Sequence, residues 1–360
     1  MTRYNKALAI LVICSLLAVA AVMSVPAVPT AQADEFAQIA QNMAGKHIYF
    51  SEGSGEPSRF TRNETGLSHL GGLLELYGAE TYTLDWRSGI PPNADLVIIA
   101  GPTRQLGADR IAWLWEYLLN GGRLLLFAEP VRNASSPLNA EDGLFVLTWN
   151  DMGLRARNDV AVQEGALRPV IPPTPHVPKD EPTPTLSPAV DVPELSTDFM
   201  TTRFNPGHPI IGRLEEGLFF TTARSIEMDG APRDAQATAL ILAPPEIYGE
   251  SDYEEYLKND YVDFDEKNDA PPGDLVLAVA MENIITKTRM VVVGDRDFVT
   301  NGGGFTTSPS YSGGFVFPGN VRFTISAITW LLETESVQDQ LSFPTPAPTT
   351  TPTNTPTPAP

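Results

Sequence analysis

The stretch ADLVIIAGPTRQLGADRIAWLWEYLLNGGRLLLFA, residues 94–128, decides the fold. Residues 94–100 form a continuous apolar run, which is typical of a strand covered on both faces of a parallel sheet. Residues 109–120 carry apolar side chains at helical spacing, and two glycines then end the helix. A second apolar run follows at 123–128. A strand, a helix and a strand of these lengths predict a right-handed crossover between parallel strands.

The same alternation continues on both sides of this stretch. Before it, we expect strands at 46–51 and 81–86, with a helix at 64–78 between them. After it, the pattern is less regular, and the expected elements are strands at 217–222, 237–242, 274–281 and 288–294 and a final amphipathic helix at 319–333. The prediction is an α/β fold with a mostly parallel sheet and flanking helices, whose β-rich second half completes or extends the sheet.

The first residues have the composition of an export segment. Within residues 1–33, two basic residues, Arg3 and Lys6, lie near the start. An uncharged apolar run follows at 7–25, and the segment ends in the small-residue pattern Ala-Gln-Ala. This arrangement predicts either a cleaved signal peptide or a retained N-terminal membrane anchor, and the sequence leaves both open. In both cases we expect the folded part to work outside the cytoplasm, secreted or tethered to the outer face of the cytoplasmic membrane.

Two other segments are set apart by their proline content. Residues 167–193 predict a disordered insertion, and residues 336–360, which end in a run of almost only proline and threonine, predict a disordered tail. Residues 34–166 and 194–335 remain as the first and second halves of one α/β domain.

The composition excludes several classes of site. The sole cysteine, Cys14, lies in the export segment, so the exported part offers no disulfide, cysteine nucleophile or thiolate metal ligand. The formal net charge of −20 disfavours nucleic acid and anionic membrane surfaces as partners. The four histidines lack metal-ligand spacing, and no Gly-x-Ser-x-Gly elbow is present. We therefore predict no metal, no cofactor and no catalytic residue.

The turn after the first expected strand is one candidate binding site. In an open α/β sheet, ligands bind beyond the carboxyl ends of the strands. Gly53, Ser54 and Gly55 lie there, and the two glycines allow backbone amides to approach a ligand. Ser58 stands where a dinucleotide fingerprint has its third glycine. The alternative is a flexible loop without a ligand.

A second candidate site follows the strand at 288–294. The sequence VVVGDRDFVTNGGG, residues 291–304, takes a buried strand into two carboxylates and a glycine-rich loop. Asp295, Asp297 and Asn301 are therefore candidates for binding a polar ligand or a partner. The competing interpretation is structural, because aspartates at such turns commonly satisfy backbone amides.

Short motifs in order along the chain resemble one protein family. They are IPPNADLVIIAGP at 90–102, YLLNGGRLLLF at 117–127, HPI at 208–210, PGDLVLA at 272–278, VVVGDRDF at 291–298 and GN at 319–320 ahead of AITWL at 327–331. This set resembles the auxiliary extracytoplasmic component of gliding-motility-type ABC transport systems (GldG-like). The first half is also similar to glutamine-amidotransferase-like domains that lack the catalytic cysteine. The resemblance implies a flavodoxin- or amidotransferase-like fold.

The resemblance also implies a function. It indicates a non-enzymatic binding or scaffold domain beside an ABC permease and ATPase, with a glycan as a further ligand class. One alternative is a carboxylate-dependent glycan-active hydrolase using Asp295 and Asp297, because acid–base hydrolysis needs two carboxylates around the substrate. Another is a cell-surface structural protein whose Pro/Thr-rich tail is a spacer. Membrane attachment is expected only through the N-terminal segment, and only if that segment is retained.

Overall fold

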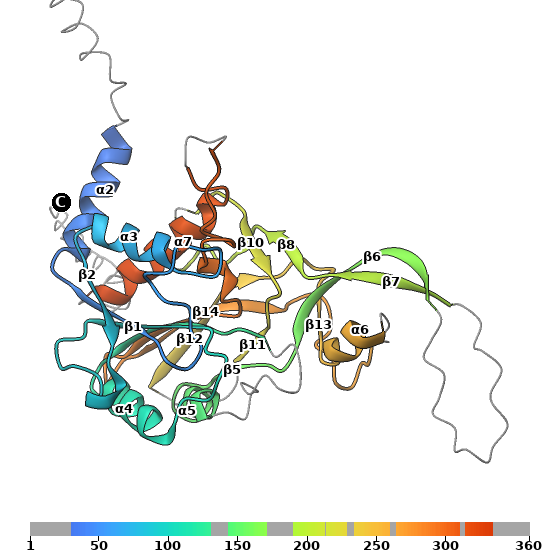
Figure 1. Ribbon diagram of the computed structural model, residues 1–360, viewed down its shortest axis with the longest axis horizontal. Helices are drawn as coiled ribbons and strands as arrows, with labels where there is room; N and C mark the ends of the chain where they lie inside the picture. The colour runs from blue at the N-terminus through green and yellow to red at the C-terminus, as the bar shows by residue number, and fades with distance from the viewer. Residues whose placement is uncertain are drawn as a thin grey trace, which may run out of the picture.

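An eight-stranded sheet with helices on both faces forms the body of the protein (Figure 1). The computed structural model describes residues 30–130, 143–170, 190–212, 214–228, 234–259, 264–309 and 314–333. The strand order is β2-β1-β3-β4-β15-β14-β12-β9. Most of the export segment, all of the Pro/Thr-rich tail at 336–360 and the centre of the proline-rich insertion lie outside the described residues.

The parallel half of the sheet confirms the predicted parallel strands joined by helices. Its strands are β1 (His47–Ser51), β2 (Glu80–Leu84), β3 (Leu96–Ala100), β4 (Arg123–Phe127) and β15 (Arg289–Val293), each parallel to its neighbours within this group. The helices α3 (Ser68–Leu76) and α4 (Ala108–Leu119) connect consecutive strands of this half. β3 and β15 are buried at every position, as continuous apolar runs require.

The second half of the chain extends this sheet, as predicted. Beyond β15 the sheet continues antiparallel through β14 (Val276–Asn283), β12 (Ala235–Leu242) and β9 (Arg203–Phe204). The mixed sheet is thus one continuous layer that draws strands from both halves of the domain. The mostly parallel α/β architecture expected from the sequence is confirmed.

The strands alternate their side chains between two apolar cores. Leu125 and Phe127 of β4 pack on the side covered by α2 (Thr30–Met43), α3 and α7 (Pro318–Leu332). Leu124 and Leu126 pack on the side covered by α4 and α5 (Gly143–Met152). This two-residue period is a property of every strand, so one short apolar run supplies both faces.

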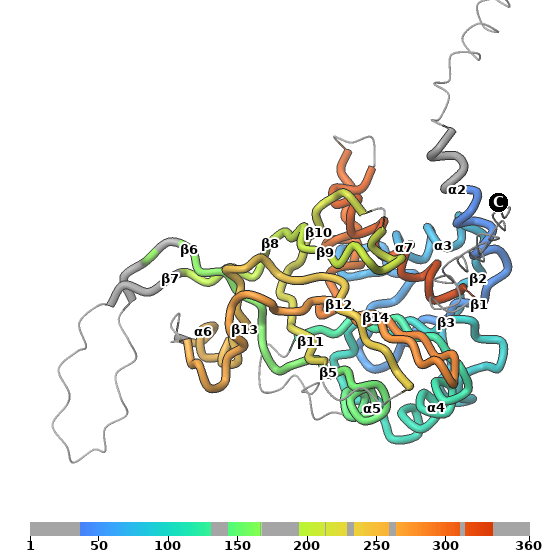
Figure 2. The backbone as a smooth tube through the Cα atoms, turned by 180° about the vertical axis from the view of Figure 1, so that it is seen from behind, coloured from blue at the N-terminus to red at the C-terminus, as the bar shows by residue number. Residues whose placement is uncertain are grey.

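A two-stranded arm projects from the body (Figures 1 and 2). It consists of β6 (Val160–Val170) and β7 (Val190–Ser196), antiparallel to each other, with β13 (Tyr248–Glu250) paired to β6 and α6 (Tyr253–Asn259) beside them. The ladder takes in residues 167–170 and 190–193, so both ends of the expected disordered insertion are strand, and residues 171–189 lie outside the described part. Backbone pairing prevails there because a proline, such as Pro193, is tolerated in an edge strand.

Smaller pairs connect the arm to the body. They are β8 (Asp198–Thr201) with β10 (Leu218–Thr221), and β5 (Leu154–Ala156) with β11 (Ile226–Met228). The short 3-10 helices are η1 (Trp86–Ser88) and η2 (Asp297–Val299). These elements bring the segment 218–228 against the carboxyl end of β15.

The N-terminal helix runs across the predicted cleavage point. α2 begins at Thr30, so the junction of residues 33 and 34 lies inside the helix. Among the helices of the described ranges, none combines the length and the apolarity needed to cross a membrane. The apolar run at 7–25 is not part of those ranges.

Candidate functional site

The carboxyl ends of the parallel strands bring both predicted glycine-containing loops to one edge of the sheet. The strand order reverses between β1 and β3, which is the switch point where ligands bind in open α/β sheets. The turn after β1 and the loop after β3 meet there, because the backbone N–H groups of Thr103 and Arg104 both donate to the Ser54 carbonyl at 2.9 Å.

The Gly53–Gly55 turn is held by its own neighbours. The Glu56 carboxylate, 9% exposed, accepts hydrogen bonds from Ser51 Oγ at 2.7 Å and from the Ser54 backbone N–H at 2.6 Å. Gly55 has φ +88°, and a Cβ there would lie 1.9 Å from Thr103 Oγ1. The glycine is therefore required by a close backbone approach within the protein, and a flexible loop is not what the contacts describe.

A recess that the sequence did not predict lies beside this turn. It has a volume of about 330 Å³ and is lined by Trp86, Arg87, Asp109, Arg110 and Trp113 together with the first residues of α4. Arg110 Nη1 donates to Ser54 Oγ at 2.8 Å, and its guanidinium lies 5.7 Å from the Trp86 ring centre. Two indoles beside a guanidinium provide an apolar platform with polar edges, which suits a protein or ligand group of mixed polarity.

The sequence contains a weak signal for this recess, namely the positions of its aromatic and arginine residues relative to the ends of the strands. Trp86 lies two residues after the end of β2, and Arg110 and Trp113 lie in the first turns of α4, so each is close to the carboxyl edge of the sheet. These positions are far apart in the sequence, and tertiary contacts such as those of Arg110 with Ser54 and Trp86 bring them together.

Asp295 is buried inside the fold. Its carboxylate is fully shielded and accepts hydrogen bonds from the backbone N–H groups of Thr221 at 2.9 Å and Phe298 at 3.2 Å. Burial raises the pKa of Asp295 well above its usual range, and the nearby carboxylates of Asp297 and Glu129 raise it further. The geometry supports the structural interpretation for Asp295, because its oxygens tie β10 to the end of β15.

Asp297 belongs to an ion network at the same edge. Arg296 lies between two carboxylates, with Nη2 3.3 Å from Glu129 Oε1 and Nε 3.3 Å from Asp297 Oδ1. Burial opposes the charge on Arg296, but these two carboxylates outweigh it and raise its pKa. A Cβ on Gly101 would lie 2.5 Å from Arg296, so the loop after β3 supports this side chain. Arg296 thus links the switch point to the predicted aspartates.

Asn301 lies in a different place from the other candidates. Its side chain, 6% exposed, donates to the carbonyls of Thr61 at 3.0 Å and Asn63 at 2.8 Å and accepts from the His69 N–H at 3.0 Å. These partners belong to the loop before α3 and to its first turn. The helix expected from residue 64 therefore begins at Ser68, because residues up to 67 form a loop held by Asn301.

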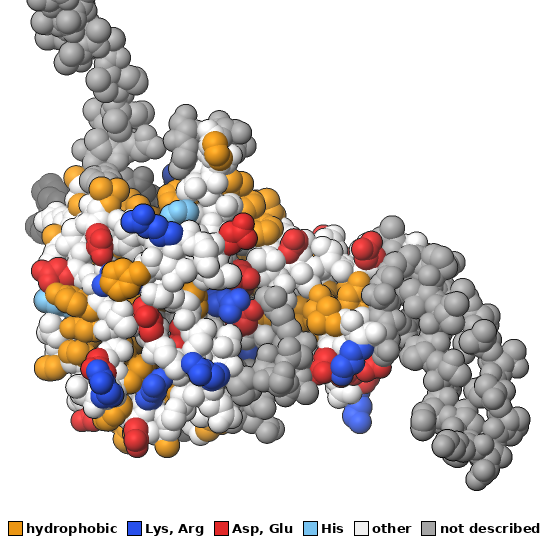
Figure 3. Space-filling view, viewed as in Figure 1, with side chains coloured by type: hydrophobic (Ala, Val, Ile, Leu, Met, Phe, Trp, Pro, Cys, Tyr) orange, Lys and Arg blue, Asp and Glu red, His pale blue; other side chains and the backbone are white. Residues whose placement is uncertain are grey.

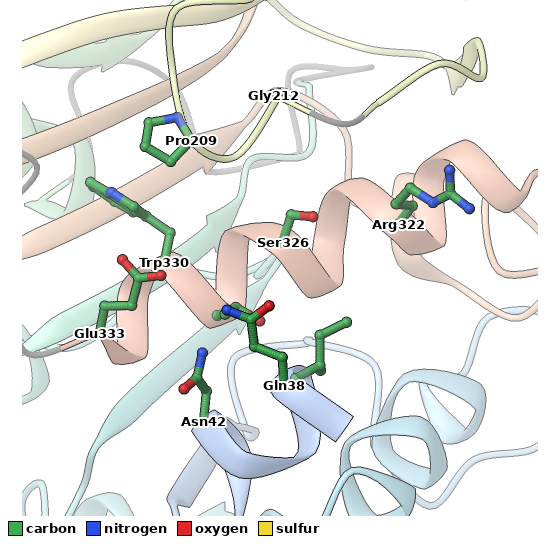
Figure 4. A pocket seen from close by; sticks show the side chains of 10 residues that line it. Gln38, Asn42, Pro209, Gly212, Arg322, Ser326, Trp330 and Glu333 are labelled. Carbon is green, nitrogen blue, oxygen red and sulfur yellow. The ribbon is translucent and has the colours of Figure 1, made fainter. Parts of the chain in front are cut away.

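A further hollow separates α2 from α7. It has a volume of about 310 Å³, and Figure 4 shows Gln38 and Asn42 of α2 on one side and Ser326 of α7 on the other. Its lining mixes amides, hydroxyls and charged groups with apolar side chains such as Ile39 and Trp330, and none of the predicted site residues takes part. As for metals, the described ranges place no group of three or more His, Cys, Asp or Glu side chains so that it could hold an ion.

Comparison with known proteins identifies a family. The family described as "ABC-type uncharacterized transport system" matches residues 45–317. No curated protein sequence matches the chain.

Similar solved structures include the mmIFT52 N-terminal domain, with 14% identity and a TM-score of 0.48 over 79% of this chain and 96% of that one. A putative ThuA-like protein from Parabacteroides merdae has 11% identity and a TM-score of 0.35 over 81% and 93% of the two chains. The exo-beta-1,4-mannosidase Op5Man5 from an Opitutaceae bacterium has 14% identity and a TM-score of 0.33 over 81% and 37%.

Proposed function

The chain belongs to the family described as ABC-type uncharacterized transport system, as an auxiliary component, and from this premise we propose that it is a non-enzymatic binding domain. In this proposal the domain works outside the cytoplasm, beside the permease and the ATPase of the transporter. It binds its partner at the carboxyl edge of the sheet, through the recess next to the Gly53–Gly55 turn. The specific likeness to gliding-motility systems is part of the same proposal.

The burial of Asp295 is the observation that carries the non-enzymatic role. A general acid or base must reach the proton that it transfers, within hydrogen-bond distance of the substrate. Asp295 is 0% exposed, and two backbone N–H groups occupy its oxygens. Asp297 faces Arg296, so it is not paired with Asp295 across an open cleft. This arrangement favours stabilisation of the fold over hydrolysis.

The export segment supports the proposed compartment. Its basic start, apolar run and small-residue end are the features of a secretory signal. The net charge of −20 disfavours nucleic acid as a partner. N-terminal sequencing of the mature protein decides between a cleaved signal and a retained anchor.

Co-purification tests the proposal directly. Tagged full-length protein, recovered from gently solubilised membranes, is expected to bring the permease and the ATPase with it. Trp113→Ala is expected to lower their recovery about tenfold or more, because buried aromatic anchors contribute about 2 kcal/mol or more to protein interfaces. Trp149→Ala is the matched control, since Trp149 lies on α5 and stacks with Arg155 away from the recess.

Three results would count against the proposal. Absence of both transporter subunits from the wild-type preparation would remove the transporter role. Glycan hydrolysis by the wild-type protein that disappears in both Asp295→Asn and Asp297→Asn would establish the carboxylate-dependent hydrolase instead. Equal recovery with Trp113→Ala and the wild type would place the partner contact elsewhere on the chain.

A further inference from the structure

A basic groove lies over the outer face of α3. We call it the α3 groove; it has a volume of about 440 Å³ and is lined by Arg59, Phe60, Arg62, Ser68, His69, Gly71, Gly72 and Glu75. Figure 3 shows basic side chains and a histidine gathered over this helix. Two arginines against one glutamate make the groove locally positive on a chain whose net charge is −20.

The hollow exists because α3 carries a pair of glycines. A Cβ on Gly72 would meet nothing within 4 Å, so this position is open to solvent. Leu76 follows one turn later on the same face and is 67% exposed. A helix interior normally disfavours glycine by about 0.5–1 kcal/mol relative to alanine. Neither local helix stability nor internal packing explains Gly72, and a glycine here leaves room for another backbone.

Phe60 and Arg59 lie side by side at the rim of the groove. Phe60 is 66% exposed, and the Arg59 guanidinium lies 3.9 Å from the centre of its ring. Arg59 Nη1 also bonds Glu75 at 3.3 Å and Thr81 at 2.7 Å, which fixes the guanidinium in place. Arg59 Nε is buried and has no hydrogen-bond partner in the part of the chain that the structure describes. Aromatic and arginine side chains are the residues that most often dominate binding energy in protein interfaces.

The glycine-rich loop at 301–304 supports this rim from behind. Asn301 bonds the carbonyls of Thr61 and Asn63, within the loop that carries Phe60 and Arg62. A Cβ on Gly302 would lie 2.6 Å from the Glu64 side chain, so the two loops pack closely. A groove fixed in advance loses little conformational entropy on binding. The predicted Asn301 thus positions a binding surface without contacting the ligand.

We propose that the α3 groove docks an acidic amphipathic helix of a transporter subunit. The proposal rests on the transporter role proposed above and names the chemistry of the partner. The apolar side of the helix packs on Phe60 and Leu76, and its backbone approaches Gly72. Its carboxylates face Arg59 and Arg62. This is the helix-in-groove mode of recognition, with charge complementarity setting the choice of partner.

Paired peptides test the groove without knowledge of the partner sequence. One amphipathic helical peptide carries leucines on one face flanked by glutamates, and its twin replaces each glutamate with glutamine. Fluorescence anisotropy with the full chain is expected to show binding of the glutamate peptide that weakens with added salt. Its twin is expected to bind about tenfold more weakly, a difference of about 1.4 kcal/mol.

Two variants locate the binding on the chain. Arg62→Glu reverses a charge at an exposed position and is expected to weaken the glutamate peptide at least about tenfold. Gly72→Gln fills the groove where no atom is displaced, and it is expected to do the same while keeping the fold. The matched controls are Lys267→Glu and Ala112→Gln, at exposed positions outside the groove, and they are expected to bind like the wild type.

The proposal is overturned if the glutamate and glutamine peptides bind alike, or if Arg62→Glu and Gly72→Gln bind like their controls. Self-association of the chain that both variants abolish would also overturn it, because the occupant would then be a second copy. Failure of the transporter role is a separate result. Wild-type protein that recovers no permease or ATPase, yet binds the glutamate peptide through the groove, refutes the transporter partner and leaves the acidic-helix chemistry standing.

Discussion

Glu250 is a buried carboxyl whose ionisation is expected to oppose folding of the arm. It lies at the end of β13 and is 1% exposed. One oxygen accepts from the Asp252 N–H at 2.8 Å, and the other accepts from the Tyr248 hydroxyl at 3.4 Å. Burial, together with the neighbouring carboxylate of Asp269, raises the pKa of Glu250 from 4.5 to about 7.

The sign of the pH effect follows from the direction of this shift. Below pH 4.5 Glu250 is protonated in both the folded and the unfolded chain. Between pH 4.5 and about 7 the unfolded chain loses this proton while the folded protein keeps it, so the free energy of unfolding falls as pH rises. One pKa unit corresponds to about 1.4 kcal/mol, which sets an upper bound of about 3 kcal/mol for this shift. We expect a loss of about 2 kcal/mol, within this bound.

Glu250→Gln removes this dependence with little change in shape. The glutamine oxygen still accepts from the Asp252 N–H, and its amide can donate to the Tyr248 hydroxyl. Urea unfolding at a series of pH values is expected to show equal stability for both proteins near pH 4, with the variant about 2 kcal/mol more stable at pH 8. Glu266→Gln, at an exposed position, is the control and is expected to follow the wild type. A constant difference between Glu250→Gln and the wild type across this range would refute the reasoning.

Three further predictions concern stability and are checked by urea unfolding. Asn301→Ala removes the hydrogen bonds that hold the loop before α3, and a loss of about 2–4 kcal/mol is expected; a loss below about 0.5 kcal/mol would deny Asn301 this role. Glu282→Gln leaves the buried Arg289 guanidinium without its carboxylate at 3.0 Å, with an expected loss of about 3 kcal/mol that an unchanged midpoint would contradict. Gly55→Ala is expected to lower the free energy of unfolding by about 2 kcal/mol or more, because of the positive φ and the contact with Thr103. Gly72→Ala is expected to raise the free energy of unfolding by up to about 1 kcal/mol. Changes of the same sign in the two variants would show that the two glycines are not distinct.

The strands were predictable because their signal is local. The runs at 94–100 and 123–128 contain β3 and β4, since a short, nearly continuous apolar run suits a strand buried on both faces. The start of α3 was not predictable in the same way. The helical spacing extends back to residue 64, but Asn301 holds the chain up to Leu67 in a loop. That contact joins residues separated by more than half of the chain, so no local window contains it.

The candidate site shows the same contrast between local sequence signals and contacts made by residues far apart in the chain. The sequence alone determined that Gly53–Gly55 and Asp295 follow strands, and parallel pairing then places them at one edge of the sheet. Only the tertiary structure decided what they do there. Thr221 and Phe298 enclose the Asp295 carboxylate, and Thr103 closes over Gly55, because burial and hydrogen bonding depend on partners brought from distant parts of the chain.

The glycine pair of α3 was present in the sequence as ordinary helix positions. Whether a glycine is required by internal packing or leaves an open surface depends on the atoms around it, and these are known only once the fold is complete. The sequence by itself therefore determined the order of strands and helices in the parallel half of the sheet, because their periods are local properties of the chain. The tertiary structure decided which polar groups are used within the protein and which surfaces remain for a partner.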